Sequence, residues 1–514
     1  MAEAELIAVR KEKLAKLKAA GINPYPDHFS LTHSTAEIRK LSAKKKPRPL
    51  ETIKKKPKSS VRLAGRIMTL RPHGKLTFAT IQDQAGQIQL AFMADVLEEK
   101  AYQPLELFDL GDFVGAAGEM FITRKGELTL LCTSFQLLSK ALRPLPEKWH
   151  GITDQEKCYR QRYLDLVMNK ETRERFQLRA QVIDFLRQYL KDNNFLEVDT
   201  PVLQNKASGA LAKPFKTHHA SLDLTVYLRI APETYLKRCV VGGLERVFEF
   251  ARCFRNEGMD PSHLQDFTML EFYYSYINAE ELMTFTEKML AALFKEILGT
   301  TKIKRGAVDL DFKPPLPRRT LAEVVKEHSG IDYPKYDSAA LLLAEIKKKG
   351  VRLEIEQPEK LSYGNLIDAL YKATARKQLI QPFFLLGHPL ELSPLARRND
   401  ENPKMVDRFQ LLADTWELVN AYSELIDPLD QRERFEEQAQ AHARGDEEAM
   451  EMDEDYLLAM EHGMPPMAGF GLGIERLIAF LTNQANLRDV LLFPLMRPLE
   501  VGAGQSTANQ SLLN

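Results

Sequence analysis

The pattern of apolar and polar positions divides this chain of 514 residues into three parts. Residues 6–20 repeat apolar positions at helical spacing among lysines, and Gly21 and Pro24 follow where a helix would end. Residues 61–138 form short strand-like runs separated by turn glycines. From residue 172, helical and strand-like stretches alternate nearly to the end of the chain, which predicts a larger α+β unit.

The middle part contains five strand-like runs, which predict a small closed Greek-key barrel. The runs read VRLAGRIMTL, KLTFATIQD, QIQLAFM, FVGAAGEMFI and ELTLLCTSFQLL. Such barrels bind single-stranded nucleic acid through a face that combines aromatic stacking with polar groups. The pattern alone favours a core position for Phe78, and nucleic-acid binding is the alternative. The residues that we place on the binding face are Arg71, Phe78, Gln89 and Glu127.

The last part predicts one large antiparallel sheet with flanking helices. We expect a helix at 176–195, followed by the strand LEVDTPVL, which Pro201 ends. A mostly helical insertion at about 279–377 is expected to cover or flank the sheet, and AGFGLGIERLIAFLT reads as a Gly-rich turn that enters a helix. The strands assigned to the sheet are LTVYLRIAP, ERVFEFARCFRNEG, FTMLEFYYSY and WELVNAYSEL.

Charge is balanced over the whole chain but unevenly distributed. The 71 Lys and Arg residues match 71 Asp and Glu residues, yet residues 1–60 hold 15 basic and 6 acidic residues and carry +9. We interpret the Lys- and Pro-rich run at 44–58 as an extended, solvated linker. Clusters of Lys and Arg supply the sequence-independent part of nucleic-acid affinity, so this arm is a candidate phosphate contact. A solvated surface without a partner is the alternative.

Composition argues against several classes of protein. No apolar run approaches the roughly 20 residues of a membrane span, and the start of the chain lacks a secretory apolar core. The cysteines lie far apart without a C-x-x-C pair, which argues against a disulfide framework or a zinc site. We therefore expect no membrane association and a reducing cytoplasmic location. The cysteines are Cys132, Cys158, Cys239 and Cys253.

Charged residues in or beside the predicted strands are the main chemical signal. Central strands rarely carry charges unless these are paired or used. Several carboxylates with two arginines suit a cationic substrate next to a polyphosphate and a metal. For any single residue, a structural ion pair is the alternative. The residues are Glu233, Arg255, Glu257, Glu271, Glu417, Glu424 and the later Arg476.

Several short motifs occur in a fixed order along the chain. They include VDTPVL (Val198–Leu203), FRNEG (Phe254–Gly258) with FTMLEFY (Phe267–Tyr273), GFGLGIERL (Gly469–Leu477), YLRIAPETYLKR (Tyr227–Arg238), VVGGLERVFE (Val240–Glu249), SPLARRND (Ser393–Asp400) and NAYSEL (Asn420–Leu425). The first three sets resemble motifs 1, 2 and 3 of the class II aminoacyl-tRNA synthetases. The others resemble the lysyl-tRNA synthetases within that class. The resemblance extends from the first helix to about Pro498.

The resemblance implies an N-terminal OB-fold barrel followed by a class II synthetase domain, with a six- or seven-stranded antiparallel sheet flanked by helices. It also implies a homodimer that forms through motif 1. The implied division is a basic N-terminal helix and Lys/Pro-rich linker (1–60), an OB-fold anticodon-binding domain (61–143), an inter-domain linker (144–172), a catalytic domain (173–500) and a flexible C-terminal tail (501–514).

The implied reaction joins L-lysine and ATP to lysyl-adenylate and pyrophosphate, and then transfers lysine to the 3′ end of tRNA(Lys). The implied cofactor is Mg²⁺, bound with ATP and held by Glu417. The resemblance assigns catalytic roles to Arg255, Glu257 and Arg476. It assigns ATP binding to the same three residues and to His263, Phe267, Glu417 and Gly473. The implied lysine-binding residues are Gly209, Glu233, Arg255, Glu271, Tyr273, Asn420, Tyr422, Glu424 and Gly471. The resemblance also assigns anticodon binding to Arg71, Phe78, Gln89 and Glu127.

Three positions depart from the family pattern. Ser262 and Leu264 occupy positions that are commonly Arg and Asn, and His263 is a candidate replacement for the missing phosphate contact. Gln410 occupies the position of a metal-binding Glu, which puts the number of Mg²⁺ ions in doubt because an amide oxygen is a neutral ligand.

Three other functions share parts of this pattern. Aspartyl- and asparaginyl-tRNA synthetases have the same implied architecture, but an anionic substrate would be repelled by Glu424. A stand-alone paralogue that modifies a translation factor lacks the barrel. A catalytically inactive RNA-binding protein would keep the barrel and the basic arm for binding alone.

Overall fold

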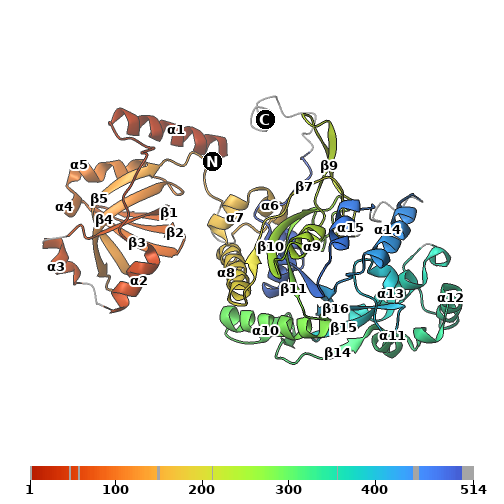
Figure 1. The fold of residues 1–514 in the computed structure, drawn as a ribbon. Coiled ribbons are helices and arrows are strands. Elements are labelled where there is room, and N and C mark those ends of the chain that lie inside the picture. The colour runs from red at the N-terminus through yellow and green to blue at the C-terminus, as the bar shows by residue number, and fades with distance from the viewer. Residues whose placement is uncertain are drawn as a thin grey trace. The chain divides into compact units, whose positions relative to one another are not determined.

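The computed structural model describes residues 3–44, 48–55, 58–146, 151–210, 212–355, 357–443 and 451–499. The chain forms two compact units, Met1–Thr153 and Asp154–Asn514. Figure 1 shows a barrel with short helices in the first unit and a sheet flanked by helices in the second. The expected tail at 501–514 lies outside the described residues, and so do parts of the two expected linkers, at 45–47, 56–57 and 147–150.

The five strand-like runs of the first unit form a closed barrel, as predicted. Alternate residues along each strand point inward, and their apolar side chains, such as Ile81, Leu90 and Val114, fill the interior. The strands pair in the order β1-β2-β3-β5-β4. Their bounds are β1 Val61–His73, β2 Leu76–Asp83, β3 Gly86–Met93, β4 Phe113–Ile122 and β5 Leu128–Ser139.

The predicted first helix is α1 (Glu3–Ala19), and Gly21 follows it with a positive φ of 75°. Arg10 fastens this helix because its guanidinium donates to the carbonyls of Leu110, Ala141 and Arg143 at 3.0 Å each. The sequence pattern did not predict α2 (Thr35–Lys44), α4 (Ala94–Leu97) or α5 (Glu99–Tyr102).

The interpretation of residues 44–58 as an extended linker is wrong for its middle. This segment contains the helix α3 (Leu50–Lys55), whose Ile53 is fully buried in a cluster with Ala91 and Phe121. The carbonyl of Pro49 accepts from the amides at positions 52 and 53, so this proline precedes the helix and does not interrupt it. Two apolar residues, Leu50 and Ile53, among lysines and prolines were too weak a signal to reveal the packing.

The second unit is built on an eight-stranded sheet in the order β14-β15-β16-β17-β18-β11-β10-β6. Neighbouring strands are antiparallel except for the two edge pairs, β14–β15 and β10–β6, which are parallel. The sheet therefore has eight strands and a parallel pair at each edge, whereas the resemblance implies six or seven antiparallel strands. The strand bounds are β6 Leu196–Glu197, β10 Arg246–Phe254, β11 Asp266–Ser275, β14 Arg318–Thr320, β15 Phe383–Pro389, β16 Met405–Ala413, β17 Trp416–Ser423 and β18 Met467–Gly473.

Two strand predictions and one turn prediction need correction. The expected strand LEVDTPVL reduces to β6, because the chain leaves the sheet before Pro201. LTVYLRIAP supplies β9 (Leu224–Leu228) to a separate three-stranded sheet with β7 (Leu203–Gln204) and β8 (Lys216–His219). The expected Gly-rich turn is β18, a central strand that pairs with both β17 and β11.

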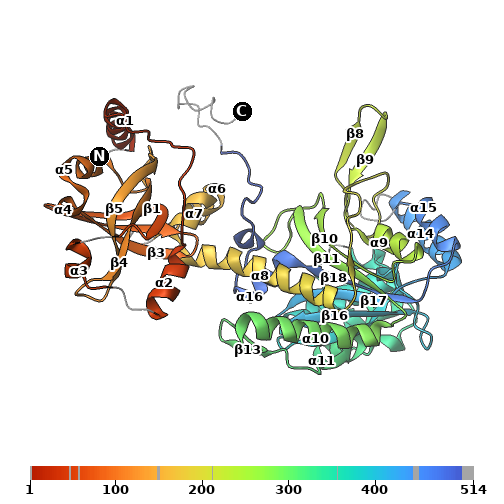
Figure 2. The ribbon, with the colours of Figure 1, turned by 60° about the vertical axis from the view of Figure 1, so that its left-hand side comes forward.

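One face of the large sheet is covered by α8 (Lys170–Asp192), α10 (Ala279–Leu298) and α16 (Ile474–Leu481), which share an apolar core with it. Figure 2 shows α8 and α10 side by side along this face. On β11, Leu270 and Phe272 point into this core, whereas Glu271 and Tyr273 alternate with them and point to the opposite face. The helices α9 (Glu233–Val241) and α15 (Glu454–Glu461) pack on that opposite face.

The predicted insertion flanks the sheet but is not only helical. Its helices α11 and α13 pack against Phe383 and Leu385 of β15 and Leu412 of β16. It also contains the hairpin β12–β13 and the edge strand β14. The remaining bounds are α6 Gln155–Arg160, α7 Arg162–Met168, β12 Lys302–Arg305, β13 Val308–Asp311, α11 Leu321–Ser329, α12 Ala339–Lys348, α13 Tyr363–Thr374 and α14 Pro428–Ala443. Within the described ranges, no helix combines the length and the apolar character that crossing a bilayer requires.

Candidate active site

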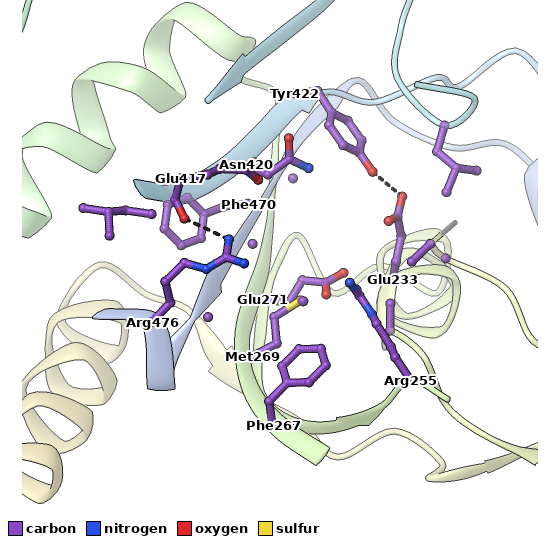
Figure 3. Close-up of a pocket in the computed structure, with 18 of the residues that line it drawn as sticks. Glu233, Arg255, Phe267, Met269, Glu271, Glu417, Asn420, Tyr422, Phe470 and Arg476 are labelled. Carbon is purple, nitrogen blue, oxygen red and sulfur yellow. Dashed lines mark hydrogen bonds between the residues drawn. The ribbon is translucent and has the colours of Figure 1, made fainter. Parts of the chain in front are cut away.

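A cavity of 370 Å³ lies over the central strands β11, β17 and β18, on the face opposite α8 and α10. Figure 3 shows Arg476 and Glu417 at one end, Glu233 and Tyr422 at the other, and Arg255 with Glu271 between them. Every residue to which the sequence analysis assigned ATP, lysine or metal binding lines this one cavity. These residues are Gly209, Glu233, Arg255, Glu257, His263, Phe267, Glu271, Tyr273, Glu417, Asn420, Tyr422, Glu424, Gly471, Gly473 and Arg476.

The pairing register of β11, β18 and β17 arranges the residues of the cavity floor in rows. Glu271 pairs with Gly471, which pairs in turn with Asn420. The next row consists of Tyr273, Gly469 and Tyr422 in the same order. Because β18 contributes glycine to the middle of each row, polar side chains from its two neighbouring strands stand on either side of an open strip of backbone.

The end of the cavity near α9 is strongly acidic. Glu233, Glu271 and Glu424 are all buried there, and the Tyr273 hydroxyl donates to Glu271 Oε1 at 2.7 Å. The Tyr422 hydroxyl donates to Glu233 Oε1, also at 2.7 Å. Glu424 is 1% exposed, and within the described part of the chain its Oε1 has no hydrogen-bond partner. A buried carboxylate oxygen without a donor is costly, so this end suits a cationic ligand.

Among the described residues, the acidic end contains one internal cation, Lys237, on the α9 turn after Glu233. Its ammonium donates to Glu233 Oε1 at 2.6 Å and forms an ion pair with Glu424 Oε2. Burial, together with the charge of Glu233, raises the pKa of Glu271 to about 8. Burial likewise raises the pKa of Glu424, although Lys237 opposes that shift. Three carboxylates around one ammonium therefore attract further positive charge.

Arg255 occupies the middle of the cavity. It follows β10, and its backbone amide donates to the carbonyl of Gln265 at 2.9 Å. Its guanidinium lies 5.1 Å from the centre of the Phe267 ring, and both side chains line the cavity. A guanidinium in this position can donate to a carboxylate and a phosphate oxygen together, while the ring offers a flat apolar surface.

The other end of the cavity suits a polyphosphate. Arg476, on α16, is half-buried and donates to the backbone carbonyl of Glu417 at 3.0 Å. Burial lowers the pKa of the Arg476 guanidinium. Within the described residues, the carboxylate of Glu417 forms no hydrogen bond or ion pair with the protein. An unengaged carboxylate beside a phosphate position fits a Mg²⁺ ion that is also held by phosphate oxygens.

The described residues contain no cluster of three or more His, Cys, Asp or Glu residues that would hold a metal without substrate. Gln410 pairs across the strands with Asn420, and its Oε1 contacts His388 Nε2 at 3.2 Å. Burial lowers the pKa of His388 to about 3, so this ring is neutral. The carboxylate of Glu417 thus lines the cavity, whereas Gln410 contacts a neutral His388 and is not among the lining residues.

The loop between β10 and β11 places His263 at the rim. Its Nδ1 contacts Asp260 Oδ2 at 2.6 Å. Although desolvation opposes the change, hydrogen bonds from Ser262 and His263 lower the pKa of Asp260 to about 2. His263 thus lines the cavity, as predicted, with one ring nitrogen engaged by a carboxylate.

Sequence reasoning missed two residues that shape the cavity. Arg408 on β16 donates to Asn420 Oδ1 at 2.7 Å and so orients that amide. Gly469 leaves room for its neighbours, because a Cβ there would lie 2.1 Å from Glu424 Oε1. The first glycine of the GFGLG run was the available signal for Gly469. Arg408 resembled an ordinary charged residue on a half-exposed strand.

In the first unit, the four predicted anticodon residues share the outer face of the barrel. Arg71 pairs with Phe78 across β1 and β2, while Gln89 pairs with Thr129, two positions after Glu127. Phe78 is half-buried beside the cluster that includes Ile53 of α3. The structure thus places Phe78 outside the barrel core.

Comparison with known protein families finds a matching family model in each of the two units. Residues 61–138 match the family model for the OB-fold nucleic acid binding domain, and residues 154–497 match the model for tRNA synthetases class II (D, K and N). The chain belongs to the class II tRNA synthetases.

Relatives narrow the position of this chain among the class II tRNA synthetases. It is 45% identical to the Lysine--tRNA ligase of Pelotomaculum thermopropionicum over 496 residues, which are 96% of each chain. It is 45% identical to that of Carboxydothermus hydrogenoformans over 96% of this chain and 98% of the relative. It is 44% identical to that of Bacillus cereus over 96% and 97%. This class II synthetase therefore groups with the lysine-tRNA ligases along nearly its whole length.

Proposed function

We propose that this chain activates L-lysine with ATP to form lysyl-adenylate and pyrophosphate, and then transfers lysine to the 3′ end of tRNA(Lys). The observation that carries the proposal is the charge of the acidic end. Within the described residues, three buried carboxylates meet one internal ammonium there, so two negative charges have no cationic protein partner when all three carboxylates are ionised. Lysine supplies two ammonium groups.

The same charge count separates lysine from other amino acids. Glu233 and Glu271 suit the α-ammonium end, with Gly209 and Asn420 nearby, while Tyr273 and Glu424 suit the ε-ammonium. A neutral side chain would leave Glu424 buried without a counter-charge, and an aspartate side chain would add a like charge. Loss of a partner for a buried charged group costs several kcal/mol on order-of-magnitude grounds, which supports strong discrimination.

The chemistry needs no covalent enzyme intermediate. The lysine carboxylate attacks the α-phosphorus of ATP in line, and the residues act by positioning and by stabilising charge. Arg255 neutralises the attacking carboxylate and the α-phosphate, Arg476 contacts the γ-phosphate, and Phe267 stacks on adenine. Glu257 contacts the nucleotide as well. When bound with ATP, Mg²⁺ held by Glu417 supplies additional positive charge on the phosphate oxygens.

We assign tRNA binding to the first unit. The outer barrel face with Arg71, Phe78, Gln89 and Glu127 is proposed to bind the anticodon, and the basic arm at 1–60 to contact phosphates. On this view residues 61–143 form the anticodon-binding domain, and residues 173–500 form the catalytic domain.

We also propose that the chain acts as a cytoplasmic homodimer. Apolar side chains near the edge strand β6 are exposed in the single chain, among them Leu196 at 51% and Leu203 at 50%. The long helix α8 leads directly into this edge. An exposed sheet edge with apolar side chains is suited to pairing with a second copy.

Amino-acid-dependent exchange of pyrophosphate into ATP tests the activity. We expect exchange with lysine and none above background with aspartate or asparagine. Exchange with aspartate but not lysine would contradict the proposal. Tight tRNA binding without any lysyl-adenylate formation would favour the inactive RNA-binding protein instead.

A further inference from the structure

Lys237 is the buried cation nearest to the acidic end, yet it does not line the cavity. Its side chain is 0% exposed, whereas its two carboxylate partners, Glu233 and Glu424, both line the cavity wall. The ammonium also lies 5.7 to 5.9 Å from the ring centres of three tyrosines. These are Tyr273, Tyr422 and Tyr456.

We propose that Lys237 is a positioning residue for lysine selection. It is a permanent internal counter-ion that orients Glu233 and Glu424, and it leaves two of the three carboxylate charges in the pocket for the ligand to neutralise. This inference rests on the proposed function, because it concerns how the same site recognises a substrate with two ammonium groups.

The geometry at Glu424 supports the orienting role. Lys237 pairs with Oε2, while Oε1 is the atom that a Cβ on Gly469 would meet at 2.1 Å. Gly469 is part of the cavity floor, so the ion pair leaves the other oxygen directed into the cavity. Since Oε1 is buried without a hydrogen-bond partner among the described residues, it is available to a ligand ammonium.

Glu233 is oriented in the same way. Its Oε1 accepts from both the Lys237 ammonium at 2.6 Å and the Tyr422 hydroxyl at 2.7 Å. Within the described part of the chain, its Oε2 has no hydrogen bond. Each carboxylate therefore gives one oxygen to the protein and keeps one for the ligand.

Removal of Lys237 changes the protonation of the pocket. With Lys237 present, Glu271 already retains a proton below about pH 8. Without the ammonium, a second of the three buried carboxylates also retains a proton near neutral pH. Lysine then has to displace this additional proton when it binds. The charged and titratable groups around Lys237 are Glu233 on α9, Glu271 and Tyr273 on β11, Tyr422 and Glu424 on or after β17, and Tyr456 on α15. The pair of Arg229 and Glu249 lies beyond them.

The variant Lys237→Met tests this role through the pH dependence of kcat/KM for lysine in pyrophosphate exchange. We expect its slope of log(kcat/KM) against pH, between pH 6 and 8, to exceed the wild-type slope by about one, which is tenfold per pH unit. The KM for ATP should not change. In the double variant Glu233→Gln, Lys237→Met, which loses one charge of each sign, the slope should return to the wild-type value.

A uniform rise in the KM for lysine, with the wild-type pH slope, would overturn the proposal and leave Lys237 a packing role only. Calorimetry on the wild-type enzyme decides the matter if the variant does not fold. At pH 7, titration with lysine in buffers of different ionisation enthalpy should show release of no more than one proton. Release of two protons would mean that Lys237 does not keep its partners ionised. Absence of lysine-dependent exchange in the wild type would instead refute the proposed function.

Discussion

Gly469 and Glu424 are so close that no side chain fits between them. A Cβ on Gly469 would lie 2.1 Å from Glu424 Oε1 and 2.7 Å from the Tyr273 ring. Both neighbours are buried, and Glu424 is already paired with Lys237. The carboxylate of Glu424, which we assign to the ε-ammonium, can therefore occupy this position only because residue 469 is a glycine.

The variant Gly469→Ala should lose lysine activation because the methyl group displaces Glu424 or Tyr273. We expect kcat/KM for lysine to fall by about 100-fold or more, in line with about 3 kcal/mol for a disturbed buried charge. The KM for ATP should change far less. Pyrophosphate exchange at varied lysine and ATP concentrations measures both values. Gly242→Ala, at the end of α9 where a Cβ meets its nearest atom at 3.3 Å, is the control.

The contribution of Glu271 to the stability of the ligand-free protein should fall as the pH rises from about 4.5 to about 8. The pKa of Glu271 is raised from 4.5 to about 8, so between these values the folded state holds a proton that the unfolded state has lost. The free energy of unfolding therefore decreases with pH across this window. Thermal unfolding at several pH values measures this trend. Glu271→Gln should flatten the curve, and an equally steep curve in that variant would contradict the assignment.

Arg255→Ala should greatly slow adenylate formation while tRNA binding stays nearly intact. The guanidinium is the cation between the phosphate end and the acidic end, so its loss removes charge stabilisation from the reacting groups. A decrease of about 10²- to 10³-fold in the rate of pyrophosphate exchange is expected. Arg246→Ala is the matched control, since Arg246 lies at the far end of β10 against Tyr274. Substantial remaining activation in Arg255→Ala would remove Arg255 from this role.

Phe78→Ala should weaken tRNA charging without changing pyrophosphate exchange. Stacking of a base on an aromatic ring contributes about 1–3 kcal/mol, so the KM for tRNA(Lys) should rise by about 10-fold or more. Phe113→Ala is a suitable control, because this partly exposed ring on β4 packs under Arg66 and not beside Phe78. Equal effects of the two variants on charging would argue against a specific anticodon contact.

The sequence predicted elements best where local pattern and burial agree. The five barrel strands are apolar runs separated by turn glycines, and the helix that became α8 has a regular apolar side, so both were recognised. The strand β18 was read as a turn, because its glycines carry no strand preference and its pairing partners lie some 50 and 200 positions away in the sequence. Non-local pairing of this kind leaves no trace in a short window of sequence.

The site residues could be named from motifs, but the role of Lys237 could not. As a lysine four residues after Glu233 it reads as an ordinary surface ion pair on a helix. Only the packing of α9 under Tyr273, Tyr422 and Tyr456 shows that the pair is buried. Arg408 was overlooked for a similar reason, since its contact with Asn420 depends on the register of β16 and β17.

The glycines of β18 leave the middle of one face of the sheet without side chains. On the helix-covered side this strand presents Ala468, Phe470 and Leu472 to a packed core, whereas on the other side Gly469 and Gly471 present only hydrogen atoms. In the proposed complex, the methylene chain of the bound amino acid lies where the side chains of the middle strand are missing. The substrate then serves as a temporary part of the protein interior, and each catalytic cycle removes and replaces it.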